Sequence, residues 1–225
     1  SSYYPENIKL IPDFFSSSLV KNKFGSKKAK VITSFSMFYD LEDPLTFMKE
    51  VYEVLDDNGV WIFEQSYMPK MLEMNSFDTI CHEHLEFYSL HQIKYMTDIV
   101  GFHIVDVNFN DINGGSFSIT VRKKLGGQQD EDKILEILQQ ESHLGLSSIN
   151  PYNEFARRID IATKELIQFV KTERAKGKMI AALGASTKGN VLLQYCKFTE
   201  DDISFIGEVN EEKLGCFTPG TFIPI

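Results

Sequence analysis

Between residues 30 and 121 the sequence alternates between apolar runs of strand length and segments with helical spacing. The expected order is strand, helix, strand, helix, strand, strand, and the ranges are 30–35, 44–55, 60–63, 89–100, 102–109 and 116–121. Alternation of this kind favours a parallel sheet, and the last two strands add an antiparallel hairpin at its edge. The sequence therefore predicts an α/β protein built on part of a Rossmann-like sheet, with an irregular stretch at 66–87.

The C-terminal half continues with helices. A glycine-containing loop at 126–130 precedes helical patterns at 131–143 and 151–176, the second with one apolar stripe. An apolar run at 178–183 and the short helix after it resemble the first strand and helix of another α/β unit. We therefore expect the start of a second, incomplete Rossmann-like unit from residue 177.

Composition narrows the class of partner. The 225 residues carry a formal net charge of -9, which disfavours non-specific binding to nucleic acid or to an anionic membrane. No apolar run approaches the roughly 18 residues that a membrane span needs. The three cysteines, Cys81, Cys196 and Cys216, are widely spaced, which is typical of a reducing compartment such as the cytoplasm.

Three consecutive ionisable side chains, His82, Glu83 and His84, follow the strand-like run at 60–63. Parallel α/β sheets bind ligands beyond the carboxyl ends of their strands, so the position of these three residues suits a ligand-binding site. A histidine takes up a proton near neutral pH and a carboxylate orients it, as abstraction of a proton next to a carbonyl requires. Two other interpretations stay open: His82 and His84 as metal ligands, although no further Cys/His cluster supports them, or a polar surface segment.

The small residues GASTKGN at 184–190 lie between an expected strand and an expected helix. They let a backbone approach a ligand closely, a helix N-terminus attracts anions, and Lys188 adds a positive charge. The spacing is not that of a P-loop. The segment predicts a phosphate or diphosphate site, with a plain strand-to-helix turn as the alternative.

A third segment, Asn113, Gly114 and Gly115, joins the last two expected strands. Asparagine and glycine adopt the left-handed conformations that tight turns need, so the spacing alone favours a hairpin turn.

Several motifs together resemble the sugar C-methyltransferase family. In the family's order they are SMFYDLEDP at 36–44, EQSY at 64–67, FDTICHEH at 77–84, NGG at 113–115, GASTKG at 184–189 and KLGCFTPGTFIPI at 213–225. Each is weak alone, but the ordered set extends over nearly the whole chain.

The resemblance implies a three-part architecture: a zinc-binding N-terminal domain, a class I methyltransferase domain that binds S-adenosyl-L-methionine (SAM), and a C-terminal Rossmann-like domain for a sugar nucleotide. The zinc-binding cysteines and the glycine-rich cofactor loop are expected before Ser1. Residues 1–124 are then the C-terminal part of the methyltransferase domain, 125–176 a helical connector, and 177–225 the start of the substrate domain. No metal is expected in this chain, because zinc belongs to the N-terminal domain.

The resemblance also implies roles for single residues. The family's Glu-His pair corresponds to Glu83 and His84, with His84 as the base and Glu83 orienting its imidazole. Cys81, which stands where well-known sugar enzymes have a tyrosine, and His82 complete the catalytic candidates. The cofactor candidates are Ser34, Phe35, Ser36 and Phe38, and the substrate candidates are Asn113, Gly114, Gly115, Ser186, Thr187 and Lys188.

The implied activity is SAM-dependent methylation of the carbon α to the ketone of a nucleoside-diphosphate keto-deoxysugar, through an enolate. The expected partner is this small-molecule sugar nucleotide. Cys81 keeps a different small-molecule acceptor open. A truncated module that binds a sugar nucleotide without activity is the third interpretation, since the cofactor's glycine loop is missing from the sequence.

Overall fold

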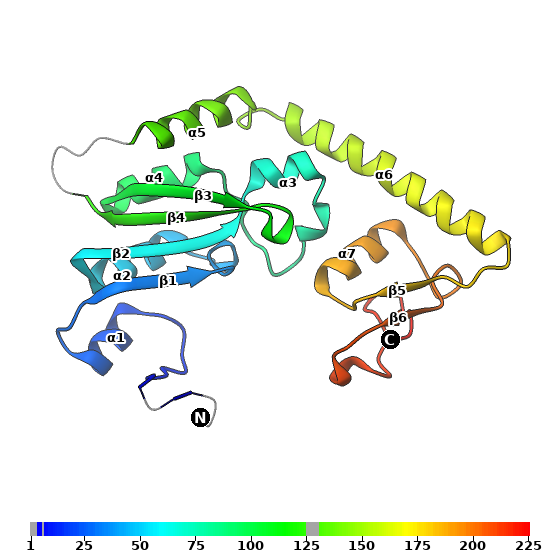
Figure 1. The fold of residues 1–225 in the computed structure, drawn as a ribbon, viewed down its shortest axis with the longest axis horizontal. Coiled ribbons are helices and arrows are strands. Elements are labelled where there is room, and N and C mark those ends of the chain that lie inside the picture. The colour runs from blue at the N-terminus through cyan, green and yellow to red at the C-terminus, as the bar shows by residue number, and fades with distance from the viewer. Residues whose placement is uncertain (1–3, 6, 125–130) are drawn as a thin grey trace. The chain divides into compact units, whose positions relative to one another are not determined.

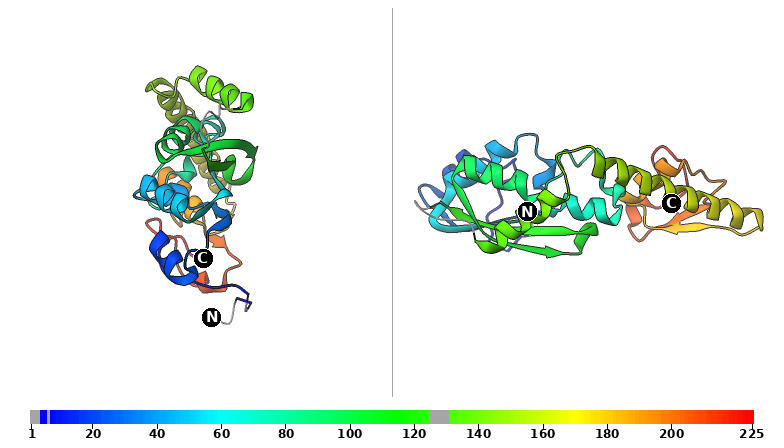
Figure 2. Two further views of the ribbon diagram at one scale, coloured as in Figure 1. Left: turned by 90° about the vertical axis from the view of Figure 1, so that its left-hand side faces the viewer. Right: turned by 90° about the horizontal axis from the view of Figure 1, so that it is seen from above.

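The computed structural model describes residues 4–5, 7–124 and 131–225, so the loop expected at 126–130 lies outside the described residues. It has a mixed α/β fold, as predicted, and it divides into two compact units (Figures 1 and 2). The first unit contains Ser1–Tyr67 and Leu85–His143, and the second contains Met68–His84 and Leu144–Ile225. The domain boundaries expected at 124 and 176 stay predictions.

The first unit is a four-stranded sheet with helices. Its elements are α1 (Ser17–Phe24), β1 (Ala29–Phe35), η1 (Phe38–Asp40), α2 (Pro44–Val54), β2 (Leu55–Ser66), α4 (Leu90–Val100), β3 (Phe102–Asn110), η3 (Ile112–Gly114), β4 (Ser116–Lys123) and α5 (Asp132–His143). The strand order is β1-β2-β4-β3. β1 and β2 are parallel, as the alternating pattern predicts, and β4 is antiparallel to both of its neighbours.

The hairpin differs from the expected antiparallel edge in one respect. β4, the second strand of the hairpin, pairs with β2 and therefore lies inside the sheet, while β3 forms the edge. β3 then runs in the same direction as β1 and β2. Its edge position is compatible with a register irregularity between Ile104 and Asp106, because an irregular strand disturbs an edge less than the middle of a sheet.

Alternation along the strands places the core on one face of this sheet. Trp61 and Phe63 of β2 are opposite Val121 and Ile119 of β4, and all four side chains are buried. Phe38 lies against Trp61 and Phe63 with ring-centroid distances of 6.0 and 5.4 Å. α2 and α4 cover this face in Figures 1 and 2. Burial of these large aromatic side chains is the main stabilising contribution of the unit.

Both covering helices begin at clear N-terminal signals. The Asp43 carboxylate accepts a hydrogen bond from the Thr46 N–H at 3.0 Å, and Pro44 occupies the first turn of α2. Ser89 and Gln92 form a capping box at α4, which ends at Gly101 in the left-handed conformation (φ 95°).

The second unit contains α3 (Met68–Met74), η2 (Phe77–Thr79), α6 (Asn150–Ala175), β5 (Ala181–Leu183), α7 (Thr187–Cys196), β6 (Phe205–Gly207) and η4 (Glu211–Lys213). β5 and β6 form a parallel two-stranded sheet. Its core contains Val170 of α6, Leu193 and Cys196 of α7, and Ile206 of β6. The expected second α/β unit is therefore present, and β5 takes up only the last three residues of the apolar run at 178–183.

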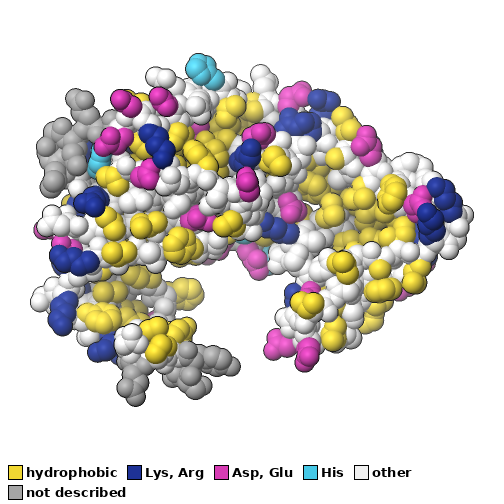
Figure 3. All heavy atoms as spheres, in the orientation of Figure 1, with side chains coloured by type: hydrophobic (Ala, Val, Ile, Leu, Met, Phe, Trp, Pro, Cys, Tyr) yellow, Lys and Arg dark blue, Asp and Glu magenta, His cyan; other side chains and the backbone are white. Residues whose placement is uncertain are grey.

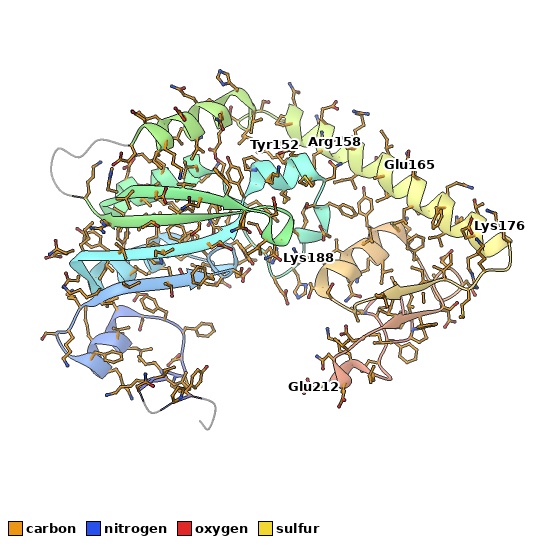
Figure 4. The ribbon with its side chains drawn as sticks, in the orientation of Figure 1. Tyr152, Arg158, Glu165, Lys176, Lys188 and Glu212 are labelled. Carbon is orange, nitrogen blue, oxygen red and sulfur yellow. The ribbon has the colours of Figure 1, made fainter. Side chains whose placement is uncertain are left out.

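Polar contacts hold the 68–84 segment in this second unit, and Figure 4 labels two of the α6 side chains involved. The Arg158 guanidinium donates to the Asn75 side-chain oxygen at 2.8 Å and to the Leu72 carbonyl at 2.6 Å. Tyr152, six residues earlier on α6, places its hydroxyl 3.9 Å from the Met68 sulfur. The segment that carries His82 to His84 thus packs with the C-terminal residues, although β2 precedes it in the sequence.

No helix among the described residues is both long enough and apolar enough to cross a membrane. Hydrophobic side chains remain on the surface in Figure 3. Among the large hydrophobic residues of the described strands, Val31 and Phe35 of β1 and Leu183 of β5 are the most exposed.

Candidate functional site

The second unit contains a cavity of about 690 Å³ between two segments that are far apart in the sequence. One wall comes from the 80–82 segment and the other from α7. The residues that contribute polar or reactive atoms are Cys81, His82, Thr187, Asn190, Gln194 and Tyr195. The Phe77 and Tyr195 rings, with centroids 5.0 Å apart, hold the walls together. The histidine segment and the GASTKGN segment, singled out separately in the sequence, therefore share one cavity.

Local hydrogen bonds fix the irregular wall. The Thr79 hydroxyl donates to the Ser76 carbonyl at 2.7 Å, and the Ile80 N–H donates to the Phe77 carbonyl at 2.9 Å. The His84 N–H donates to the Cys81 carbonyl at 3.2 Å. These hydrogen bonds satisfy polar backbone groups of the wall, although it forms neither an α-helix nor a strand. Its side chains are therefore not part of a paired sheet.

His84 is half-buried, and its ring has a defined partner. Nδ1 lies 2.7 Å from the carbonyl oxygen of Thr79. A carbonyl only accepts hydrogen bonds, so Nδ1 carries the proton and donates it. In the neutral imidazole the lone pair is then on Nε2. The contact fixes the tautomer and the orientation that a histidine base needs.

The other catalytic candidates are more exposed. His82 Nε2 lies 4.0 Å from the Glu83 carboxylate, and the two side chains are 85% and 57% exposed. Cys81 is half-buried and lines the cavity with His82. The orienting partner of His84 seen here is the Thr79 carbonyl. The assignment of Glu83 as the orienting group stays a prediction.

The GASTKGN loop is fixed by the last residue of β6 and by residues that follow this strand. Gly184 has a φ of 87° and donates its N–H to the Gly207 carbonyl at 2.8 Å. The Ala185 N–H donates to the Glu208 carboxylate at 2.7 Å, and the Lys213 ammonium donates to the Ala185 carbonyl at 2.7 Å. Backbone N–H groups of Asn210, Ala185 and Val209 lower the pKa of Glu208.

These contacts restrict where an anion could bind. A carboxylate already occupies the Ala185 amide, so like-charge repulsion disfavours a phosphate there. Ser186 caps α7 by accepting the Gly189 N–H at 3.0 Å. Thr187 lines the cavity, and Lys188, labelled in Figure 4, is its neighbour in the first turn of α7. An anion site in this loop would therefore lie in the first turn of α7, at Thr187 and Lys188.

The cofactor candidates are in the first unit, at the carboxyl end of β1. Ser34 accepts a hydrogen bond from the Trp61 indole at 2.9 Å, and the Phe35 side chain is 56% exposed. Ser36 has a φ of 50°, and its N–H donates to the Glu64 carbonyl at 2.8 Å. Phe38 is only 1% exposed and belongs to the aromatic core. In this structure the Phe38 side chain is a core residue, so a contact with a ligand could involve its backbone only.

Asn113, Gly114 and Gly115 form the turn between β3 and β4 of the first unit. All three have positive φ (56°, 85° and 119°), as the hairpin interpretation predicts. The Gly115 carbonyl accepts the Tyr67 N–H at 3.0 Å, which places the turn beside the end of β2. Their substrate role stays a prediction.

Sequence reasoning included Asn190 in the GASTKGN segment, but it named neither Asn190 nor the later α7 residues of the cavity wall as site residues. Asn190, Gln194 and Tyr195 follow Thr187 at intervals of three, four and one residues, so they share one face of α7. Extending the loop motif by helical spacing would have found them. The Tyr195 hydroxyl donates to the Asp160 carboxylate at 2.9 Å, and this contact raises the pKa of Tyr195.

A buried carboxylate in the first unit was missed as well. Glu141 of α5, 1% exposed, accepts hydrogen bonds from the Tyr67 hydroxyl (2.8 Å), the Leu90 N–H (2.6 Å), the His91 N–H (3.0 Å) and His91 Nδ1 (2.7 Å). Burial and this carboxylate raise the pKa of Tyr67. Glu141 lies 51 residues after the Leu90 amide that it caps, and local sequence patterns do not reveal such a partner. Among the described residues, no three His, Cys, Asp or Glu side chains gather as metal ligands would.

The chain belongs to the C-methyltransferase family, because the model of the C-methyltransferase C-terminal domain matches residues 111–225. A methyltransferase-domain model matches residues 4–107. These matches confirm the resemblance seen in the ordered motifs.

C-methyltransferase NovU from Streptomyces niveus is 29% identical over 197 residues, which are 88% of this chain and 47% of NovU. The chain therefore spans about half the length of this curated relative. Solved structures with some likeness include the CcbJ methyltransferase from Streptomyces caelestis (10% identity, TM-score 0.34, 45% of this chain and 60% of that chain). Another is magnesium protoporphyrin IX methyltransferase from Synechocystis PCC 6803 with bound SAH (9% identity, TM-score 0.35, 44% and 46%). Likenesses this remote carry no argument about function.

Proposed function

We propose that this chain is part of a SAM-dependent C-methyltransferase that methylates the carbon α to the ketone of a nucleoside-diphosphate keto-deoxysugar. The observation that carries the proposal is the His84 ring, fixed by the Thr79 carbonyl with its lone pair on Nε2. Family membership supports the reaction type. The three free cysteines support a cytoplasmic location.

The proposed role of His84 is that of a general base. Nε2 takes the proton from the α-carbon, and the electron pair of the broken C–H bond moves onto the ketone oxygen to give an enolate. The Nδ1–H bond to Thr79 keeps the imidazole oriented while the ring becomes positively charged. The enolate carbon then forms the new C–C bond to the methyl group. Holding the acceptor against this base is what the protein contributes to the rate.

When bound, SAM supplies a methyl group attached to a positively charged sulfur. The sulfur keeps the electrons of the broken S–C bond. The carboxyl end of β1 fits such a group, because Phe35 exposes an aromatic face and Ser36 is exposed beside it. Zinc is not needed for any step derived from these residues.

The sugar nucleotide is proposed to bind in the second unit, with its diphosphate at the N-terminus of α7. Thr187 and Lys188 lie there, and the helix dipole favours negative charge. Cys81, which stands where well-known sugar enzymes have a tyrosine, lines the same cavity. This difference favours a methyl acceptor other than the sugars of those enzymes.

Calorimetry tests the nucleotide part of this proposal. Lys188→Ala should raise the dissociation constant of a thymidine-diphosphate sugar, whereas Lys164→Ala, an exposed lysine of α6, should not. Equal dissociation constants of the thymidine-diphosphate sugar for the two variants would mean that the loop is a plain strand-to-helix turn.

SAM is titrated separately against this chain. Binding of the sugar nucleotide without binding of SAM would favour the second candidate, a sugar-nucleotide-binding module. The separate core of the second unit is the observation that supports this candidate.

A further inference from the structure

The 68–84 segment, which carries the proposed base, leaves the first unit and returns to it at neighbouring points. It follows Tyr67, the residue after β2, and the first unit resumes at Leu85. Tyr67 and Tyr88 form an isolated parallel β-bridge, so the entry and the exit of the segment lie side by side. The position of the segment therefore depends on how these two ends are held.

The exit is held directly beside the base. The Leu85 N–H and the Glu86 N–H donate to the Tyr39 carbonyl at 3.0 and 3.1 Å. His84 is the residue immediately before this anchor. Consecutive Cα atoms are only about 3.8 Å apart, so a displacement of the exit would move the backbone of His84 with it.

Glu141 of α5 joins the entry to the exit. Its carboxylate, 1% exposed, accepts a hydrogen bond from the Tyr67 hydroxyl at 2.8 Å on the entry side. On the exit side the same carboxylate accepts the Leu90 N–H at 2.6 Å, the His91 N–H at 3.0 Å and the His91 ring at 2.7 Å. One buried side chain thus holds both ends of the segment.

A helix cap alone does not account for this carboxylate. Ser89 and Gln92 already form a capping box at the start of α4, and the hydrogen bond from Tyr67 has no part in a cap. Removing a carboxylate from water is costly, and an apolar side chain would pack α5 without this cost. A directional contact that fixes the two ends gives the buried carboxylate a reason to be there.

Aromatic contacts fix the entry from its other side. The Tyr67 ring packs against Phe109 and Phe117, with centroid distances of 4.9 and 4.8 Å. Burial and the Glu141 carboxylate raise the pKa of the Tyr67 hydroxyl, so the hydroxyl keeps its proton as a donor at neutral pH. The ring and the hydroxyl of Tyr67 are therefore both held.

We infer that Glu141 is a positioning residue for methyl transfer: it holds Tyr67 and the start of α4, and thereby fixes the ends of the segment that carries His84. This inference rests on the proposed role of His84 as the base. Glu141 acts through the backbone of the 68–84 segment. Such a role matters for the rate, because a misplacement of about 1 Å costs roughly 10²-fold.

Methyl transfer from radiolabelled SAM to dTDP-4-keto-6-deoxyglucose, measured in the full-length protein, tests the inference. Tyr67→Phe removes only the hydroxyl of the entry and leaves Glu141 its donors at Leu90 and His91. We expect kcat to fall about ten- to a hundredfold, while the KM for SAM changes by less than about twofold. Glu141→Gln, which replaces one of the two accepting oxygens by a donor, should lose at least as much.

The matched controls are conservative changes at exposed positions of the same unit. Tyr95→Phe on α4 and Glu136→Gln on α5 should keep the kcat of the unchanged protein.

Two readouts separate positioning from a loss of folded protein. First, kcat is expressed per SAM-binding site counted by calorimetry, so unfolded molecules do not lower it. Second, residues that act as one unit show non-additive losses. Adding Tyr67→Phe to His84→Ala, or to Glu141→Gln, should therefore cause little further loss of turnover.

An unchanged kcat per SAM-binding site in both Tyr67→Phe and Glu141→Gln would overturn the inference. A loss from Tyr67→Phe that is as large in the His84→Ala background as in the unchanged protein would overturn it too. His84→Ala by itself tests the proposed function. If only this variant loses turnover, His84 stands as the base and the positioning role of Glu141 fails; if His84→Ala keeps its turnover, both fail.

Discussion

His84 Nδ1 lies 2.7 Å from the carbonyl oxygen of Thr79, a residue five positions earlier in the same irregular segment. A backbone carbonyl only accepts hydrogen bonds and cannot be removed by mutation, so it fixes the tautomer of the neutral imidazole. In this structure the lone pair of the neutral ring is therefore on Nε2.

We predict that His84→Ala lowers methyl transfer in the full-length protein by a factor of about 10²–10⁴, the usual contribution of a positioned base. Binding of SAM should be unchanged. Transfer of a radiolabelled methyl group measures the first and calorimetry the second. The control is His143→Ala, an exposed histidine at the end of α5. If His84→Ala keeps most of the turnover, His84 has no part in the mechanism.

Glu141→Ala should destabilise the first unit by about 3–5 kcal/mol, because it leaves donors of Tyr67, Leu90 and His91 without their buried acceptor. Urea unfolding followed by the fluorescence of Trp61, the single tryptophan, measures this. Glu136→Ala, an exposed change on the same helix, should alter the unfolding free energy by less than about 0.5 kcal/mol. Similar midpoints for the two variants would contradict the role of Glu141 as a buried cap.

Gln65 gives a prediction of opposite sign. Its amide is 1% exposed, and neither of its polar atoms has a hydrogen-bond partner among the described residues. Gln65→Met keeps the shape and removes both polar atoms, so the free energy of unfolding should rise by about 1 kcal/mol. The same urea titration detects the change, with Gln139→Met on the exposed face of α5 as the control. A lower midpoint for Gln65→Met would mean that the amide has a stabilising partner.

Glu173 should make the stability of the second unit depend on acid pH. Hydrogen bonds from the Lys176 and Lys178 side chains lower the pKa of Glu173 from 4.5 to about 2. A folded-state pKa below the unfolded one means that the stabilisation is complete above about pH 4.5 and is lost as the pH falls toward 2.

The melting temperature followed by circular dichroism between pH 6 and pH 2.5 should therefore fall less for Glu173→Gln than for the unchanged chain. Glu165→Gln, at an exposed position labelled on α6 in Figure 4, should follow the unchanged chain. Salt should reduce the difference, because exposed ion pairs are screened. Identical curves for all three proteins would show that these ion pairs do not contribute to stability.

Apolar periodicity was enough to predict most elements of the fold. The expected helix at 151–176 is observed as Asn150–Ala175, and the expected strand at 30–35 as Ala29–Phe35. α3 was not predicted, since it has only seven residues and begins beside Pro69. The position of β4 between β2 and β3 was not predictable either, because each strand's own pattern fits either pairing.

The candidate site was predictable where its residues form short motifs, and less so where the contacts are long-range. His84 and Lys188 were found from local residue types and the family resemblance. The partner of His84 was not, because a carbonyl group has no signature in the sequence. Glu141 and Gln194 were not found for a related reason: their roles depend on what they face in the folded chain.

The second unit is assembled from two separate stretches of chain, Met68–His84 and Leu144–Ile225. A single continuous segment that starts at Leu144 does not contain the whole unit. It would lack one wall of the cavity together with the proposed base. Any rigid-body displacement of this unit would carry His84 along with the Asn190 helix. The proposed base His84 is thus part of the same unit as the proposed nucleotide site. A domain exchange that replaced only residues 144–225 would combine His84 with a different nucleotide site.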